Sequence, residues 1–334
     1  MSGWANNGIH GLMALRIQPL LSYICGMRLL TALAALCITI QLHAAPAGAL
    51  RYTDEVFNTI TIDSVLYSSP EGKALWMDIY QPVGDTATLR PLVILAHGGS
   101  FMHGNRRSER LPALCRSLAQ RGYVAVSIEY RLTTLVGMAS KPSAYKNILK
   151  SVADGRAAVT WFLNDIAHGN TYRVDKNKIY AGGSSAGAIL AEQLGFIDST
   201  RECTGALYKA ACRYLPDSTA LPPHTIKGIL SLAGAVLDTN LIGRHEPALL
   251  HIHGDADHIV QYQYKRAIKG WAPFKMAGLG GSRQRYLSQG LQYTEHVIQN
   301  GNHTPWDEDD AAYRILLQQV VAFLSAQVNT VANH

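Results

Sequence analysis

One stretch, AGGSSAGA at residues 181–188, constrains most strongly what this chain can fold into. It joins an apolar segment, KIYAGG, to an apolar segment with helical spacing, SAGAILAEQLGF. Its centre matches the pattern G-x-S-x-G, which puts a reactive serine on a sharp, strained strand-to-helix turn. Side chains two residues before and after that serine would strike the neighbouring elements, so glycine is needed there. Gly183 and Gly187 therefore select Ser185 over Ser184, although a glycine-rich turn without chemistry remains the alternative.

The rest of the sequence predicts strands that alternate with helices. Apolar runs with breakers predict strands at 74–82, 91–99, 123–131, 178–183, 226–236, 247–254 and 292–299. Helical spacing predicts helices at 111–122, 146–166, 185–196 and 309–327. Because the central runs are apolar on both faces, we expect an α/β fold with a mostly parallel sheet covered by helices on both sides. Two segments, 197–226 and 271–290, have no clear element.

The first 47 residues differ from the rest, because they hold two basic residues and no acidic one. From Met27, a basic start, an apolar run and small residues predict a secretory signal peptide, with cleavage near 44–47. Initiation at Met27 is an alternative to the first methionine. We therefore expect residues 1–47 to be a leader, an exported (periplasmic or secreted) protein, and a single domain over 48–334. The apolar run is short for a membrane span, so no stable span is expected in the mature chain.

The composition narrows the class of protein further. Hydrophobic residues make up 48% of the chain and charged residues 16%, which is typical of a globular protein. The formal net charge of +6 includes Arg16 and Arg28 of the leader, and without them it is +4. Because the basic residues are scattered, no nucleic-acid partner is predicted. The sequence leaves the oligomeric state open.

A serine hydroxyl is a weak nucleophile, so Ser185 requires a base, an acid that orients the base, and donors for an oxyanion. AHGGSF at 96–101 follows a buried strand, and its glycines let backbone N–H groups turn toward a substrate. Ala186 would begin the next helix and carry the positive end of its dipole. We predict an oxyanion hole from the N–H groups of Gly99, Ser100 and Ala186, with His97 as a brace of the loop.

Histidines and aspartates after the last predicted strands supply the other two groups. His258, His296 and His303 all lie beyond the acid candidates. His303 is the predicted base because it lies in the loop NGNHTPW after the last strand, whereas His296 lies inside a strand segment. Asp255 and Asp257 both follow the strand PALLHIHG. The residues alone leave the choice between these two carboxylates open.

With these motifs in order, the chain resembles the α/β-hydrolase superfamily, and within it the microbial carboxylesterases whose oxyanion loop begins His-Gly-Gly. The motifs are HGGSF at 97–101, YRL at 130–132, GGSSAGA at 182–188, HGDADHIV at 253–260 and GNHTPW at 301–306, and the resemblance covers about 65–325. It implies a Ser185–Asp257–His303 triad, ester hydrolysis through an acyl-enzyme, and no cofactor or metal. Ser100 stands where the family often has a third glycine, and its N–H serves equally well. YRL implies a structural role.

The predicted substrate is a short-chain or carbohydrate-linked ester, because neither 197–226 nor 271–290 shows a continuous apolar face. Both segments begin near the carboxyl ends of strands, so we expect them to wall the pocket. A serine peptidase or a lipase of the same fold is the alternative within the class. A metal-dependent hydrolase that uses HIHGDADH at 251–258 is the alternative from another class, and a non-catalytic binding module is a third.

The cysteines give one more prediction. Cys203 and Cys212 are the only close pair after the leader, and an exported protein can keep a disulfide there. We therefore predict a disulfide between them. Cys115 lies in a helical apolar pattern and is predicted to stay a buried thiol.

Overall fold

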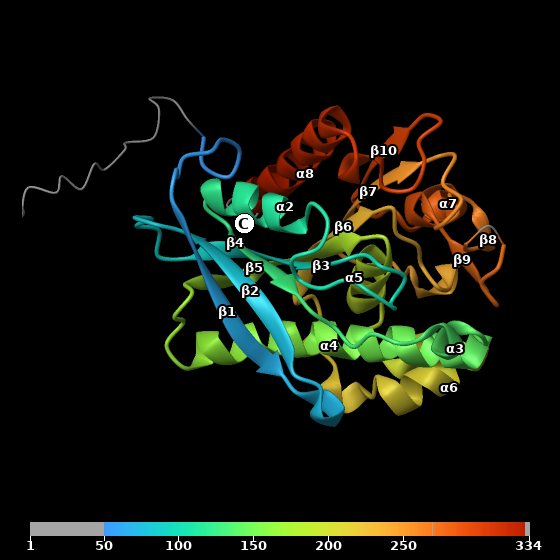
Figure 1. The fold of residues 1–334 in the computed structure, drawn as a ribbon. Coiled ribbons are helices and arrows are strands. Elements are labelled where there is room, and N and C mark those ends of the chain that lie inside the picture. Colours follow the sequence, from blue (N-terminus) through green and yellow to red (C-terminus); the bar gives the residue numbers. More distant parts are fainter. Residues whose placement is uncertain (1–49, 269, 331–334) are drawn as a thin grey trace, which may run out of the picture. The chain divides into compact units, whose positions relative to one another are not determined.

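Strand β3 (Arg90–Ala96) shows why the sheet forms where it does, because all seven of its residues are buried. A continuous apolar run of this length fits a strand covered on both faces. The computed structural model describes residues 50–268 and 270–330. Around β3, eight strands form one sheet in the order β1-β2-β4-β3-β5-β6-β7-β10 (Figure 1).

The sheet is mostly parallel, as predicted. Strands β4 (Val124–Ile128), β5 (Val174–Ser184), β6 (Ile226–Leu232), β7 (Ala248–Gly254) and β10 (Tyr293–Ile298) run parallel to their neighbours around β3. At one edge, β1 (Ile60–Ser68) pairs antiparallel with β2 (Leu75–Pro82), which pairs antiparallel with β4. A separate two-stranded ribbon joins β8 (Tyr264–Arg266) and β9 (Lys275–Ala277).

Helices cover both faces of the sheet, and each face has its own cluster of buried apolar residues. On one face, α2 (Leu111–Gln120) and α8 (Asp310–Thr330) pack with buried residues of the strands. On the other face lie α4 (Lys141–Ala167) and α5 (Ala186–Phe196), with α6 (Gly205–Tyr214) against α4 (Figure 1). The remaining helices are α3 (Leu135–Met138), α7 (Leu279–Gln289) and the short 3-10 turns η1 (Pro70–Gly72), η2 (Thr200–Glu202), η3 (Asp217–Thr219), η4 (Thr239–Leu241) and η5 (Pro305–Asp307). Within the described ranges, no helix is long and apolar enough to cross a membrane.

The two segments without a predicted element turn out to be partly helical. Segment 197–226 contains α6, and segment 271–290 contains β9 and α7. The sequence pattern of α7, LGGSRQRYLSQ, is weak because only Leu279, Ser282 and Tyr286 are buried. Strand β1 was also not predicted, because most of its residues are exposed and give no apolar run.

The predicted disulfide is wrong for this structure, in which Cys203 and Cys212 are both free. Cys203 is buried just before α6, whereas Cys212 is exposed inside that helix. A helix rises about 1.5 Å a residue, so the segment between them holds the two far apart along its axis. A disulfide requires α-carbons within about 7 Å. Cys115 is a buried free thiol on α2, as predicted.

Candidate active site

Ser185 stands on the turn between β5, which ends at Ser184, and α5, which begins at Ala186. Its backbone has φ 53° and ψ −116°, a conformation that non-glycine residues rarely adopt. Such strain persists only where the surrounding structure enforces it, and it is frequent at functional sites. The local sequence enforces it here, because a buried parallel strand must reverse directly into a buried helix.

The two flanking glycines allow this turn to form. A Cβ on Gly187 would lie 2.0 Å from the carbonyl oxygen of Ala96, and one on Gly183 would lie 2.4 Å from the same atom. Ala96 is the last residue of β3, so the turn packs directly against the neighbouring strand. The glycines at both positions are therefore explained by close backbone packing, as the sequence pattern predicted.

His303 lies between Ser185 and Asp257. Its Nε2 is 2.8 Å from Ser185 Oγ, and its Nδ1 is 2.7 Å from Asp257 Oδ2. Asp257 follows β7 and His303 follows β10, two adjacent parallel strands whose carboxyl ends meet at one edge. In this arrangement the Ser185 hydroxyl donates to Nε2, and Nδ1–H donates to the carboxylate.

The Asp257 carboxylate is held ionised. It is almost fully buried, and burial by itself would raise its pKa. Hydrogen bonds from His253 and His303 outweigh burial and hold the pKa at about 2. The other oxygen, Oδ1, accepts from the backbone N–H groups of Ile259 (2.7 Å) and Val260 (3.0 Å).

The other acid and base candidates lie elsewhere. Asp255 is exposed, and its Oδ1 accepts from the backbone N–H of Asn300 at 2.6 Å, so it braces a turn. His258 is exposed in the loop after β7, and His296 is a residue of β10. Ser184 is the last residue of β5 and is not placed against His303 by any hydrogen bond of the described residues.

The loop after β3 presents backbone N–H groups beside Ser185. Gly99, Ser100 and Phe101 all have positive φ, a run of left-handed residues that turns the chain sharply. Within the described part of the chain, the N–H groups of Gly99 and Ser100 donate to no protein acceptor. Ala186 is the first residue of α5, so its N–H also points out of the helix N-terminus. Two of the predicted donors, Ser100 and Ala186, border one space together with Ser185, and Gly99 precedes Ser100 in the loop.

His97 stabilises this loop by contacts with Tyr130 and Gly98. Its ring stacks on Tyr130 with centroids 4.3 Å apart, and its Nδ1 donates to Gly98 O at 2.6 Å. The Tyr130 hydroxyl donates to His97 O at 2.8 Å. Burial lowers the pKa of His97, which keeps it neutral. Arg131, the next residue of YRL, pairs with the buried Asp154, so both residues serve structure, as expected.

A small apolar cavity of about 50 Å³ opens beside Ser185. Ser100, Ala186 and Ile189 line it together with Ser185, and Phe274 and Met276 come from segment 271–290. Sequence analysis missed the other residues that line this cavity. The loop after Asp257 supplies Ile259, Val260, Ala267 and Ile268, and α3 and α4 supply Met138 and Ile148. For the four residues after Asp257, the signal in the sequence was a set of apolar side chains in a loop.

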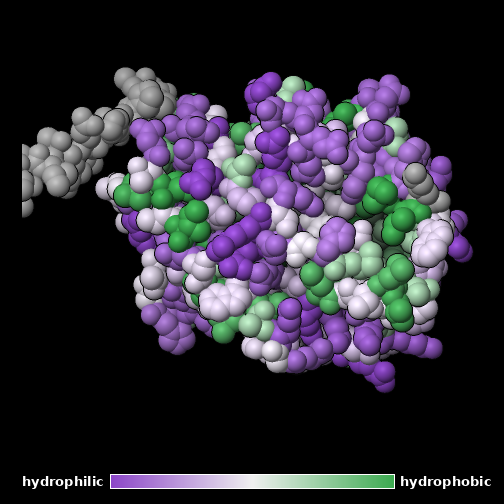
Figure 2. Space-filling model, in the orientation of Figure 1, coloured by the Kyte–Doolittle hydropathy of each residue, from purple (hydrophilic) through white to green (hydrophobic). Residues whose placement is uncertain are grey.

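A second, wider apolar groove of about 420 Å³ adjoins this cavity. The two share Ser100, Met138, Ile268, Ala272 and Phe274. Its rim includes Val136 and Trp271, which are 81% and 75% exposed. Figure 2 shows apolar side chains gathered on this side of the molecule, over α3 and beside β9. Segment 271–290 does therefore contribute to an exposed apolar face, contrary to the expectation from sequence.

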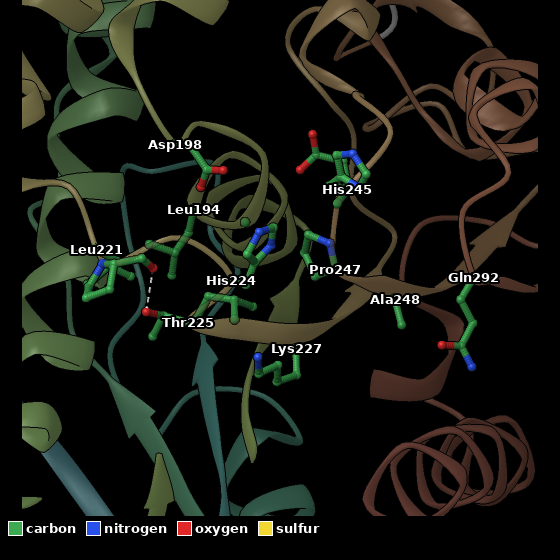
Figure 3. Close-up of a pocket in the computed structure, with 14 residues that line it drawn as sticks. Leu194, Asp198, Leu221, His224, Thr225, Lys227, His245, Pro247, Ala248 and Gln292 are labelled. Atoms are coloured by element: carbon green, nitrogen blue, oxygen red, sulfur yellow. Dashed lines mark hydrogen bonds between the residues drawn. The ribbon is translucent and has the colours of Figure 1, made fainter. Parts of the chain in front are cut away.

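Segment 197–226 does not wall either cavity. Its residues Leu221, Pro222, His224 and Thr225 instead line a separate cavity of about 340 Å³ (Figure 3). That cavity is bordered by Ile226 and Ala248, the first residues of β6 and β7. Ser185 follows the carboxyl end of a strand, at the opposite edge of the sheet, so this cavity is distant from Ser185. The expected role of this segment at the pocket is wrong.

The metal alternative finds no support in the geometry. His251 and His253 project from β7 to one side of the sheet, as strand alternation requires, and both are fully buried. Among the described residues, no three His, Cys, Asp or Glu side chains are grouped so that they could hold a metal ion. Asp255 points instead to the turn at Asn300.

Comparison with known proteins agrees with this fold. The family model BD-FAE matches residues 77–234, which span β3 and the Ser185 turn. The native esterase 2 of Thermogutta terrifontis is similar in structure, with a TM-score of 0.59, 19% identity, and coverage of 79% of this chain and 91% of that one. Its butyrate-bound form gives a TM-score of 0.59 at 18% identity, with 79% and 94% covered. The likeness shows that the chain has the α/β-hydrolase fold of these esterases.

Curated relatives share only part of their length with this chain. The non-reducing polyketide synthase ausA of Penicillium brasilianum is 27% identical over 237 residues, which is 68% of this chain and 9% of that protein. The non-reducing polyketide synthase mapC' of Penicillium brevicompactum is 32% identical over 143 residues, 41% of this chain and 6% of that protein. The chain thus spans less than a tenth of the length of these relatives.

Proposed function

We propose that this chain hydrolyses carboxylic esters through an acyl-enzyme on Ser185. The observation that carries the proposal is the pair of hydrogen bonds by which His303 joins Ser185 Oγ to Asp257. In a carboxylesterase-like fold, this arrangement supplies a nucleophile, a base and an orienting acid.

The reaction proceeds in two halves. Ser185 Oγ attacks the carbonyl carbon, its proton passes to His303 Nε2, and the oxyanion is stabilised by the N–H groups of Gly99, Ser100 and Ala186. Collapse of the intermediate breaks the bond to the alcohol oxygen, which takes the proton from His303. Water then attacks the acyl-enzyme with His303 again as base, the acid leaves, and the Ser185 hydroxyl is restored.

The small cavity supports a short acyl group. It has only a fraction of the volume of the groove that adjoins it, and its lining is almost entirely apolar. A longer acyl chain would therefore have to extend past the cavity into the groove. The similar Thermogutta terrifontis esterase 2 was captured with propionate and with butyrate, which are short acyl groups. We therefore propose a preference for acyl groups of up to about four to six carbons.

Polar groups near His303 support an alcohol with hydroxyl groups, such as a sugar. Glu109 and Asp307 both interact electrostatically with His303. The alcohol oxygen must lie near His303 Nε2 to take its proton, so we propose that these carboxyl groups face the leaving alcohol. A carbohydrate-linked ester would find hydrogen-bond acceptors there.

A lipase is the second candidate, because the apolar groove with exposed Val136 and Trp271 adjoins the acyl cavity. Longer acyl chains that pass through the cavity would lie in this groove. The chain-length series below separates the two candidates.

The test uses the chain from residue 48 onward and p-nitrophenyl esters of acetate, butyrate, octanoate and palmitate. We expect kcat/KM to be highest for acetate or butyrate. Ser185→Ala should lower kcat by about 10³-fold or more, and Ser184→Ala, its matched control, far less. Equal losses in the two variants would contradict the choice of nucleophile. A maximum at palmitate with activation by a lipid surface would identify a lipase, and cleavage of peptide p-nitroanilides alone would identify a peptidase.

We also propose that the protein is exported after cleavage near 44–47, which lies outside the described residues. The support is the basic, apolar and small-residue order from Met27. N-terminal sequencing of protein from the periplasm or medium tests it. An intact leader on cytoplasmic protein would contradict it.

A further inference from the structure

A row of buried polar side chains extends from Asp257 into the protein, and the reaction proposed above does not use it. It passes through His253 and His251 on β7 to Glu192 on α5. All three side chains have no solvent exposure. Polar groups buried this deeply are costly unless they have partners, so their contacts define what the row can do.

His253 contacts the acid of the triad directly. Its Nε2 lies 2.8 Å from Val260 O and 3.3 Å from Asp257 Oδ2. A carbonyl oxygen can only accept, so Nε2 carries a hydrogen, which faces both oxygens. His303 donates to the same carboxylate oxygen at 2.7 Å. Asp257 Oδ2 is therefore shared between two histidines.

His251 determines which ring nitrogen of His253 carries the hydrogen. Its Nδ1 lies 3.5 Å from His251 Nε2, so with hydrogen on its own Nε2 it accepts from His251. His251 Nε2 lies 3.9 Å from Glu192 Oε1.

Glu192 is anchored in turn from two other elements. Ser231 Oγ of β6 donates to its Oε1 at 2.5 Å, and the Tyr286 hydroxyl of α7 lies 3.3 Å from its Oε2. Burial raises the pKa of Glu192 to about 8, and burial lowers the pKa of His251. Glu192 and His251 are therefore both uncharged near pH 7.

We propose that His253 is a positioning residue of the triad, which holds Asp257 by a second hydrogen bond to Oδ2 and shares its negative charge with His303. His251 keeps His253 in the donating tautomer, because its Nε2 lies against Nδ1 of His253. This proposal rests on the proposed catalytic role of Ser185, His303 and Asp257. Its consequence is electrostatic: without the second donor, more of the Asp257 charge acts on His303, and the pKa of His303 rises.

Four variants separate this role from simple packing. His253→Leu removes the donor, and His253→Asn keeps a small polar side chain that does not reach the position of Nε2. His253→Gln reaches that position and restores a donor. His258→Gln is the matched control, because His258 follows Asp257 in sequence but is exposed.

Two measurements are made on each variant: an NMR titration of the His303 ring, assigned with His303→Gln, and the pH dependence of kcat/KM. The other titratable groups around His303 are Glu109 and Asp307, and those around His253 are His251 and Tyr262. All of them are present in every variant, so differences report on position 253.

In the Leu and Asn variants we expect the pKa of His303 to rise by about one unit, and the acidic limb of kcat/KM to move with it. Their kcat should fall about tenfold with KM within about twofold, because the lost bond orients the base without contacting substrate. His253→Gln and His258→Gln should match the parent protein.

An unchanged or lowered pKa of His303 in the folded Leu and Asn variants would overturn the proposal. Failure of both to fold while the Gln variant folds would assign His253 a purely structural role and overturn it equally. If the parent protein hydrolyses no ester, the proposed function fails, but the NMR titration still decides whether His253 shares the Asp257 charge.

Discussion

The α-carbon of Gly187 packs so closely against Ala96 that a Cβ at position 187 would lie 2.0 Å from the Ala96 carbonyl oxygen. No real side chain tolerates that distance, and the obstacle is backbone of a central strand. The shape of the Ser185 turn therefore depends on two residues that carry no chemistry of their own.

Gly187→Ala should accordingly displace the Ser185 turn. We expect a loss of about 3 kcal/mol or more in the free energy of unfolding, since neither β3 nor α5 can move away without disturbing the core. Activity should fall with it, because Ser185 shifts relative to His303. Urea unfolding and ester hydrolysis measure the two effects.

Gly84→Ala is the control for this prediction. Gly84 has positive φ, but a Cβ added there would contact no other atom. Only backbone strain of about 1 kcal/mol is therefore expected, with unchanged activity. Similar losses in the two variants would show that the conformation, rather than the contact with Ala96, makes glycine necessary.

Asp257→Asn should damage hydrolysis far more than Asp255→Asn. An amide at 257 no longer stabilises the protonated His303 ring and can select its wrong tautomer, so kcat should fall by about 10³- to 10⁴-fold. Asp255 only accepts from the Asn300 N–H, and its loss should leave kcat within about threefold. Steady-state kinetics on p-nitrophenyl butyrate decides, and the reverse order would make Asp255 the acid.

The local patterns around Ser185 could be predicted because each depends on a few neighbouring residues. Gly183 and Gly187 specify the turn at Ser185, and the loop that contains Gly99 follows from a buried strand that ends in glycines. The choice between Asp255 and Asp257 could not be made from spacing alone. It depends on Asn300, Ile259 and Val260, whose N–H groups capture the two carboxylates.

Features that depend on tertiary packing escaped prediction. Helix α7 carries two glycines and forms because Tyr286 packs in the core, which no local pattern reveals. The prediction of a Cys203–Cys212 disulfide rested only on the closeness of the two residues in sequence. In the structure, α6 holds them apart. Strand β1 is mostly exposed and takes its register from pairing with β2.

Glu192 should make the protein less stable as the pH rises. Its pKa in the folded protein is about 8, against an ordinary value of 4.5, so between these values the folded state holds a proton that the unfolded state has lost. Stability therefore falls with rising pH, by roughly 4 kcal/mol from pH 5 to pH 8.

Glu192→Gln removes this titration while it keeps a hydrogen-bond partner for Ser231. Urea unfolding at pH 5 and pH 8 should show a smaller decline in the variant than in the parent protein, and Glu308→Gln, at an exposed site, should follow the parent protein. Equal declines for all three proteins would show that Glu192 ionises in the folded state as it does in the unfolded chain.

Phe274 lines both the small cavity beside Ser185 and the wider apolar groove. It is 5% exposed and packs edge-on against Tyr145 with ring centroids 5.0 Å apart. Phe274→Ala should join the two spaces and admit longer acyl chains. We expect the ratio of kcat/KM for octanoyl over butyryl esters to rise by at least about tenfold.

The control for Phe274→Ala must separate the change in the cavity from a general loss of stability, because truncation of a core phenylalanine costs about 3–5 kcal/mol. Phe323→Ala serves, since Phe323 is equally exposed but lies on α8, against the other face of the sheet. It should destabilise the protein without changing the ratio for octanoyl over butyryl esters. An unchanged ratio in Phe274→Ala would mean that the acyl chain does not enter this cavity.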